Sequence, residues 1–263
     1  MPLSHLYPPA NLYAINNDHD YDVLTPENTF LRSNHLSSIT EEVQKQMEQA
    51  TIGQSKVAVW YEVRSMRITS SHFGRVCKAT ERTDFDRLAR ELVSQTHFHS
   101  AATDHGLKYE PIAIKEFEKA TGLLTKECGV FVSASHPYLC STPDRLIDDD
   151  RIVEVKCPFS AKDRPISPVS VPFLEKTGGE LTLSKTHNYY YQVQGQLFCT
   201  GRQMCLFVVY TLSDMKCISI SRDADFIAAM ISTLEHFYCS HFKRACLDKF
   251  FYKNYYTFNF DNI

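Results

Sequence analysis

The sequence predicts a mixed α/β fold, in which a central mixed β-sheet is flanked by helices. Of the 263 residues, 43% are hydrophobic and 22% are charged, which is typical of an ordinary globular chain. From residue 110 onwards, helical and strand-like patterns follow one another in the order helix, three strands, helix, two strands, helix. This order, without internal repeats or low-complexity tracts, favours a sheet covered by helices.

The chain divides into an N-terminal segment and one domain. Residues 1–35 are rich in Pro, Asn, Asp, His and Tyr and have no clear period, which predicts an arm or tail. Residues 36–263 are expected to form a single domain, whose motif-bearing core spans residues 60–221.

Helix signals begin with Ser38 followed by Glu41, a capping-box pattern that predicts a helix over residues 39–50, ending before Gly53. A short helical turn is expected over residues 60–64. A further helix should start near Thr69 or Ser70, where its first amide groups would be free. Apolar spacing predicts further helices over residues 84–95, 110–121, 187–199 and 223–243.

Extended apolar runs predict strands over residues 126–133, 138–147, 151–157, 204–211 and 216–221. Asp148, Asp149 and Asp150 predict a tight turn between the second and third of these strands. Pro158 is expected to end the third strand, because proline cannot donate a ladder hydrogen bond.

The net charge restricts how the chain can bind a polyanion. It has 28 Lys and Arg residues against 31 Asp and Glu residues, so its formal net charge is −3. No global positive field therefore attracts nucleic acid. Binding to a polyanion would need a local basic groove or metal ions.

Membrane and disulfide signals are weak. No apolar run approaches the ~20 residues of a membrane span, and residues 1–10 do not resemble a signal peptide, so we expect no membrane association. The nine cysteines form no CxxC pair, which indicates reduced thiols in an intracellular protein and gives no zinc-binding spacing. Without a dense Lys/Arg cluster, nuclear and cytoplasmic placement both stay open.

The pattern that indicates chemistry is Pro143-Asp144, followed ten residues later by Glu154-x-Lys156. Because side chains alternate along a strand, Glu154 and Lys156 share a face with Ile152. An acid and a base on an apolar strand cost free energy when buried, unless they are paired or bind a metal. The predicted hairpin brings Asp144 close to Glu154.

Asp144 and Glu154 together predict a metal site. Two carboxylates held close repel each other unless a divalent cation lies between them. Hard oxygen ligands suit Mg²⁺, or alternatively Mn²⁺, and such an ion polarises a phosphate oxygen. Lys156 would orient the attacking water or help to deprotonate it. A Glu-x-Lys triplet alone is common on edge strands, so the prediction depends on its combination with Pro143-Asp144.

These motifs resemble those of the PD-(D/E)XK nucleases, and most closely the lambda-type exonucleases, also called YqaJ-type viral recombinases. The resemblance covers about residues 60–210, and its most specific runs are residues 154–159 and 191–197. The matching pieces stand in the family's order: Arg64, residues 68–71, 106–111, 141–144, 154–159 and 191–197. The resemblance implies a restriction-endonuclease-like core with a central mixed β-sheet flanked by helices.

The same resemblance implies a two-ion site. Asp144, Glu154 and the main-chain carbonyl of Val155 would hold the principal Mg²⁺, and Glu110 would contribute to a second ion.

Lys156 would serve the nucleophilic water in this family, and Gln192 would position Lys156 or the scissile phosphate. Arg64, Ser71 and Thr142 match positions that grip the 5′-phosphate of a DNA end. There is an independent physical reason for this grip, because a guanidinium forks onto phosphate oxygens and a helix N-terminus adds amide donors.

Some positions depart from the pattern or leave it open. Arg145 follows Asp144, where the family commonly has Gly; its side chain would narrow the site or add a phosphate contact. The run 189–191 consists of three tyrosines that would stack on bases or pack, with packing favoured for two of them. Gln196 lies four residues after Gln192, and a solvated position is favoured for it.

Three functions follow from these residues. The first is a metal-dependent DNA exonuclease acting on 5′-phosphorylated duplex ends. The second is an endonuclease or nickase on the same fold. The third is a non-catalytic DNA-binding module, which the intact acidic and basic residues disfavour. The resemblance further implies a homotrimer and a single-strand annealing partner.

Overall fold

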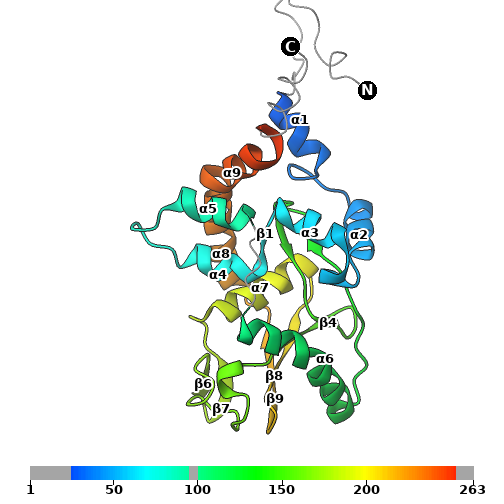
Figure 1. Cartoon of the computed structure of the whole chain (residues 1–263), viewed down its shortest axis with the longest axis vertical. Coiled ribbons are helices and arrows are strands. Elements are labelled where there is room, and N and C mark those ends of the chain that lie inside the picture. Colours follow the sequence, from blue (N-terminus) through cyan, green and yellow to red (C-terminus); the bar gives the residue numbers. More distant parts are fainter. Residues whose placement is uncertain (1–24, 95–99, 253–263) are drawn as a thin grey trace, which may run out of the picture.

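The fold centres on a four-stranded mixed sheet in the order β4-β5-β8-β9 (Figure 1). The computed structural model describes residues 25–94 and 100–252. Strand β5 (Arg151–Lys156) runs antiparallel to β4 (Arg145–Leu146) and parallel to β8 (Met204–Tyr210), which pairs antiparallel with β9 (Met215–Ser221). The predicted central mixed sheet is therefore confirmed.

A second sheet lies beside the first, in the order β1-β3-β2. It consists of β1 (Ile68–Thr69), β3 (Leu139–Ser141) and β2 (Phe131–Val132), and a separate hairpin is formed by β6 (Leu174–Thr177) and β7 (Glu180–Leu183). The strand predicted over residues 138–147 is wrong, because it is divided into β3 and β4. Pro143 lies in the break and has no amide hydrogen to donate. The strand predicted over 126–133 is likewise reduced to β2 and an isolated bridge at Lys126.

Helices cover both faces of β5. Ile152 lies in a core cluster with Val193 and Leu197 of α7 (Asn188–Thr200). Val153 and Val155, on the opposite face, pack in a cluster with residues of α6 (Ala101–Thr121). The predicted alternation along this strand is confirmed, and each face of the strand packs against one of the two helices. The predicted helix 110–121 was too short, because Ser100 caps a helix that begins at Ala101 and passes through Pro111.

Close packing joins α7 to α4 (Ser70–Cys77). A Cβ atom at Gly195 would lie 2.5 Å from the ring of the fully buried Phe73 and 3.0 Å from the Ser70 Cβ. Glycine is therefore needed here because of the close approach. This contact holds the start of α4 against the helix that carries Gln192.

Several of the remaining helices, among them α1, α5 and α9, lie towards the other end of the molecule (Figure 1). Helix α2 begins at Glu41 with Thr40 as its cap, so the predicted cap at Ser38 was two residues too early. The predicted helix 223–243 is α8, which continues through a π-helical turn into α9. The bounds are α1 (Pro26–Ser33), α2 (Glu41–Ala50), η2 (Gln54–Lys56), α3 (Ala58–Ser65), α5 (Phe85–Ser94), η3 (Phe159–Ala161), α8 (Ala224–Phe237), η4 (Tyr238–Phe242), α9 (Lys243–Leu247) and η5 (Asp248–Tyr252).

The predicted N-terminal arm is described only in part. Residues 1–24 lie outside the described residues. Residues 26–33 form helix α1, and its Leu31 is buried in a core cluster with residues of α5 and α8. None of the helices in residues 25–94 and 100–252 is long and apolar enough to cross a membrane.

Candidate active site

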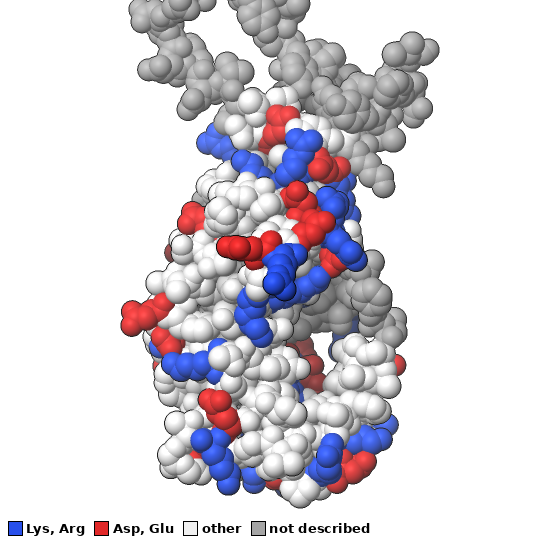
Figure 2. Space-filling view, turned by 90° about the vertical axis from the view of Figure 1, so that its left-hand side faces the viewer, with Lys and Arg blue, Asp and Glu red and all other residues white. Residues whose placement is uncertain are grey.

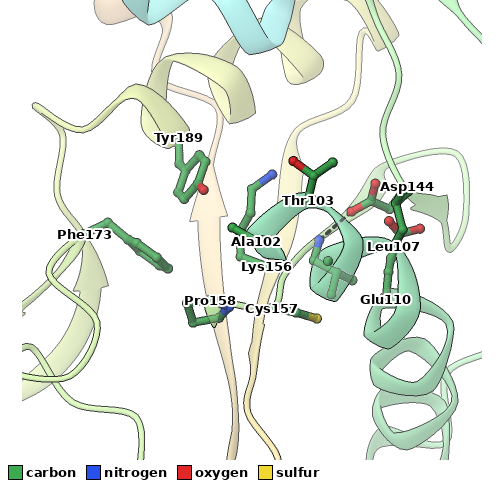
Figure 3. Close-up of a pocket in the computed structure, with 12 residues that line it drawn as sticks. Ala102, Thr103, Leu107, Glu110, Asp144, Lys156, Cys157, Pro158, Phe173 and Tyr189 are labelled. Atoms are coloured by element: carbon green, nitrogen blue, oxygen red, sulfur yellow. Dashed lines mark hydrogen bonds between the residues drawn. The ribbon is translucent and has the colours of Figure 1, made fainter. Parts of the chain in front are cut away.

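A pocket of about 270 Å³ opens where α6, the end of β5 and the start of α7 meet (Figure 3). Figure 3 shows the carboxyl groups of Glu110 and Asp144 close together on one side, and Tyr189 and Phe173 on the other. Lys156 lies between them. The residues that line the pocket are Ala102, Thr103, Gly106, Leu107, Glu110, Asp144, Val155, Lys156, Cys157, Pro158, Phe173 and Tyr189. The structure thus brings Glu110, Asp144, Val155 and Lys156 together, as the sequence predicts.

Asp144 reaches the pocket because the chain leaves the ladder between β3 and β4. Its carboxylate accepts a hydrogen bond of 2.7 Å from the main-chain amide of Val155, drawn as a dashed line in Figure 3. The side chain of Gln54, which does not line the pocket, donates to the carbonyl oxygen of Pro143 at 3.0 Å. These contacts fix Asp144 against β5.

Glu154 is not among the residues that line the pocket and is only 1% exposed. Its Oε1 accepts hydrogen bonds of 2.6 Å from Lys156 Nζ and from Gln192 Nε2. Its Oε2 accepts a bond of 2.6 Å from Gln196 Nε2. Both carboxylate oxygens are therefore satisfied by side chains of β5 and α7.

Burial and neighbouring charges shift the pKa values of Asp144, Glu110 and Lys156. Burial, followed by the charges of Glu154 and Glu110, raises the pKa of Asp144 well above its ordinary value. Burial and the charge of Glu154 also raise the pKa of Glu110. For Lys156, burial lowers the pKa, but the charges of Glu154 and Asp144 outweigh it and hold the pKa above its ordinary value. Lys156 is therefore an ammonium ion at neutral pH.

The donor set fits a hydrated Mg²⁺ ion. Glu110 makes no hydrogen bond or ion pair with any described residue, and Asp144 uses only Oδ2, so carboxylate oxygens remain in the pocket. Mg²⁺ prefers such hard oxygens and often takes only one or two carboxylates, keeping several waters. Among the described residues, no group of three or more His, Cys, Asp or Glu side chains is arranged to hold a metal ion. Glu154 is engaged by three side-chain donors. The three-carboxylate set of Glu110, Asp144 and Glu154 stays a prediction.

The residues predicted to hold a 5′-phosphate come from α3, the first turn of α4 and the residue that follows β3. Arg64 donates a hydrogen bond of 3.1 Å to Thr142 Oγ1, and its guanidinium lies 4.0 Å from the Trp60 ring centroid. Ser71 is exposed in the first turn of α4, within 2.9 Å of the Thr69 hydroxyl. Because Thr69 pairs with Cys140 in the parallel β1–β3 register, Ser71 and Thr142 each lie two residues beyond that pair.

Some predictions about single residues need correction. Gln196 is fully buried beside Glu154, so the solvated position was wrong. Its spacing of four residues from Gln192, which places both side chains on one side of a helix, was the signal that could have found it. Two of the three tyrosines pack, as predicted: Tyr190 bonds to Asp223, and Tyr191 contacts Phe226.

The third tyrosine and Arg145 contribute to the site itself. Tyr189 lines the pocket, with Lys156 Nζ 4.6 Å from its ring centroid. Arg145 does not enter the pocket lining; it donates to the Asp144 carbonyl at 2.7 Å and lies 3.6 Å from Glu127. Its charge still acts on Glu110.

The surface around the site carries both charges. Figure 2 shows a hollow with acidic side chains inside it, and Lys and Arg side chains gathered above it over α4 and α5. A shallow depression there is lined by Arg75, Arg82 and Arg87 together with Glu91. Glu91 forms ion pairs with Arg75 and Arg87, so this basic surface is partly neutralised.

Known proteins resemble this chain in sequence and in fold. An alkaline nuclease of Orgyia pseudotsugata multicapsid polyhedrosis virus is 25% identical over 205 residues, which are 68% of this chain and 46% of that protein. The chain therefore spans about half the length of this curated relative. The crystal structure of an alkaline exonuclease from Laribacter hongkongensis matches with a TM-score of 0.56 and 25% identity, over 70% of this chain and 91% of that one.

A more distant structure shows the fold alone. The shutoff and exonuclease protein of Kaposi's sarcoma-associated herpesvirus matches with a TM-score of 0.53 and 11% identity, over 79% of this chain and 73% of that one.

The YqaJ-like viral recombinase domain model matches residues 59–203, a span that includes Arg64, Asp144, Glu154 and Gln192. This match covers more than half of the chain, so the protein belongs to the family of YqaJ-like viral recombinase domains.

Proposed function

We propose that this protein is a Mg²⁺-dependent deoxyribonuclease that hydrolyses phosphodiester bonds from the 5′-phosphorylated end of duplex DNA. Mn²⁺ is the alternative ion, and two ions per site are expected. The observation that carries the proposal is the placement of the Glu110 and Asp144 carboxylates in one pocket with the Lys156 ammonium group. Two acids that repel each other beside a fixed cation suit the binding of divalent metal and a phosphate diester.

The two named relatives support a nuclease. One is an alkaline nuclease and the other is an alkaline exonuclease. Because this chain spans 46% of the first, the activity of that whole protein comes to this chain only as part of the proposal. The relative of known structure is covered over 91% of its length, which favours the exonuclease assignment.

Each side chain has a distinct role in the proposed reaction. Glu110, Asp144 and the Val155 carbonyl would hold Mg²⁺ with Glu154, and the ion supplies Lewis-acid charge that stabilises charge developing on the phosphate. Lys156, held as a cation by Glu154, orients water and offsets phosphate charge. Its ammonium group donates to Glu154 Oε1, and from this position Lys156 would orient the attacking water or help to deprotonate it.

The DNA end would be held at the second sheet. The Arg64 guanidinium, oriented by Thr142 Oγ1 and Trp60, provides a fork for the 5′-phosphate, and Ser71 adds a hydroxyl in the first turn of α4. This contact would place the first phosphodiester bond in the pocket. Homotrimer formation and a single-strand annealing partner remain proposals for the assembled protein.

One digestion experiment tests the function. Linear duplex with a 5′-phosphate, the same duplex with a 5′-hydroxyl, and a closed circle are each incubated with Mg²⁺, Ca²⁺ or EDTA. We expect Mg²⁺-dependent loss of the phosphorylated strand, an intact circle, and no activity for Lys156→Ala. Lys176→Ala, a change to an exposed lysine of β6, serves as the matched control.

The other outcomes separate the alternatives. Equal digestion in EDTA would refute the metal mechanism. A cleaved circle would favour the endonuclease or nickase. Binding of duplex ends without hydrolysis in any metal would favour the non-catalytic module.

A further inference from the structure

Gln196 lies between the two parts of the proposed site. Its side chain is fully buried on α7, and its amide nitrogen lies 2.6 Å from Glu154 Oε2. The same nitrogen lies 3.4 Å from the carbonyl oxygen of Thr142. One amide group therefore contacts a carboxylate of β5 and the main chain just after β3.

These contacts complete a continuous set of hydrogen bonds. Arg64 donates to the Thr142 side chain, while Gln196 donates to the main chain of the same residue. Gln196 then holds one oxygen of Glu154, and Lys156 and Gln192 hold the other. The residue that would contact the DNA end is thus linked to the acidic site through a single buried side chain.

Glu154 depends on these donors for its orientation. At 1% exposure it has almost no access to bulk water, so a lost donor cannot simply be replaced by solvent. Lys156 and Gln192 both donate to Oε1, and within residues 25–94 and 100–252 the donor to Oε2 is Gln196. Without Gln196, Oε2 would lose this donor and the carboxylate would be held at Oε1 alone.

Gln194 shows what a purely structural glutamine does on the same helix. It is equally buried, but its amide donates to the Ser221 carbonyl at 2.9 Å and its oxygen accepts from the Asp223 amide at 2.9 Å. These bonds join α7 to the end of β9 and the start of α8. Gln194 contacts none of the pocket residues through these bonds and is therefore a matched control.

We propose that Gln196 is a positioning residue that fixes Glu154 against the Thr142 main chain and so joins the DNA-end contact to the acidic site. This role rests on the proposed function. It predicts that the benefit of a 5′-phosphate to the turnover rate passes through Gln196, whereas binding of the DNA end does not.

The test compares the full-length parent with Gln196→Met, which keeps the volume and removes the amide, and with Gln194→Met. kcat and KM are measured on 5′-phosphorylated and 5′-hydroxyl duplex, and the shift in Tm caused by Mg²⁺ is measured without DNA. For Gln196→Met we expect kcat on the phosphorylated duplex to fall about 10- to 100-fold with KM nearly unchanged. The ratio of kcat between the two substrates should approach one, and the Mg²⁺-induced Tm shift should shrink.

Gln194→Met should lower Tm but keep the parent's substrate ratio and its Mg²⁺-induced shift. If Gln196→Met does not fold, Gln196→Asn carries the test: its shorter amide withdraws from Glu154, and an intermediate loss of kcat and of the substrate ratio is expected. Retention of the parent's ratio and Mg²⁺ shift in the Gln196 variants would overturn the proposal. An equal loss of both in Gln194→Met would do the same.

The two proposals fail differently. If the parent cleaves neither duplex, the proposed function fails, but the Mg²⁺-induced Tm shift still tests Gln196. The positioning role is supported if Mg²⁺ shifts the Tm of the parent and of the Gln194 variant equally and shifts that of the Gln196 variant less. No shift in the parent, or an equal shift in all three proteins, overturns it.

Discussion

The main-chain amide of Val155 donates a 2.7 Å hydrogen bond to the carboxylate of Asp144, and so ties the break between β3 and β4 to the central strand. This bond favours the charged form of Asp144, whereas burial and the nearby charges of Glu154 and Glu110 disfavour it and prevail. Asp144 is thus held in a position that is costly for the protein without a bound cation.

Asp144→Asn should therefore inactivate the protein and stabilise its metal-free form. The asparagine oxygen can still accept from Val155, while the repelled charge is removed. We expect the free energy of unfolding, measured by urea titration in EDTA at neutral pH, to rise by about 1 kcal/mol. The Mg²⁺-induced Tm shift of the parent should be lost.

Asp163→Asn provides the control, because Asp163 is an exposed carboxylate after η3. It should change neither the unfolding free energy nor the Mg²⁺ shift. Equal or lower stability of Asp144→Asn relative to this control would show that the charge conflict at Asp144 has no energetic consequence.

The sequence predicted the part of the site that depends on local patterns. The period of two along β5 placed Glu154 and Lys156 on one face and Val153 on the other, as the core clusters confirm. The break after β3 was not predicted, because the run 138–147 is apolar enough for one strand. Pro143 was the signal, since it cannot donate a hydrogen bond to a neighbouring strand.

Contacts between distant segments were harder to predict. The burial of Gln196 depends on how α7 lies over β5, which neither segment determines alone. Likewise, α6 begins nine residues before the predicted start because Ser100 caps it, although Gly106 and Pro111 weaken the helical pattern between. Tertiary packing overrode the local propensity in both cases.

Gly195→Ala should destabilise the protein, because its methyl group would lie 2.5 Å from the buried ring of Phe73. Either α7 must move away from α4 or the ring must leave its position. We expect a loss of about 1–3 kcal/mol in unfolding free energy by urea titration. Gly106→Ala on α6 meets no atom within 4 Å and should instead stabilise by about 0.5–1 kcal/mol. If both substitutions changed the unfolding free energy in the same direction, the close contact between α7 and α4 would be contradicted.

Arg64→Lys tests the proposed phosphate grip. Lysine keeps the positive charge but loses the planar fork and the stacking on Trp60. We expect the preference for 5′-phosphorylated over 5′-hydroxyl duplex, measured as kcat/KM, to fall about tenfold. Arg90→Lys, on the exposed side of α5, should keep the preference. An unchanged preference in Arg64→Lys would remove Arg64 from the end contact.

His72, in the first turn of α4, should make the fold sensitive to acid. Burial, and then the charges of Arg64 and Arg75, lower the pKa of His72 to about 4 in the folded protein. The unfolded chain, with a histidine pKa near 6.5, therefore binds a proton first as the pH falls. The folded state keeps its full stability above about pH 6.5 and loses it progressively towards pH 4.

His72→Gln should therefore reduce the loss of unfolding free energy between pH 7.5 and 5 by about 1–2 kcal/mol. His236→Gln, which removes an exposed histidine of α8, controls for the loss of a histidine as such. If the unfolding free energies of the parent and His72→Gln, measured by urea titration, fell in parallel with pH, the pKa of His72 would not be lowered in the folded protein.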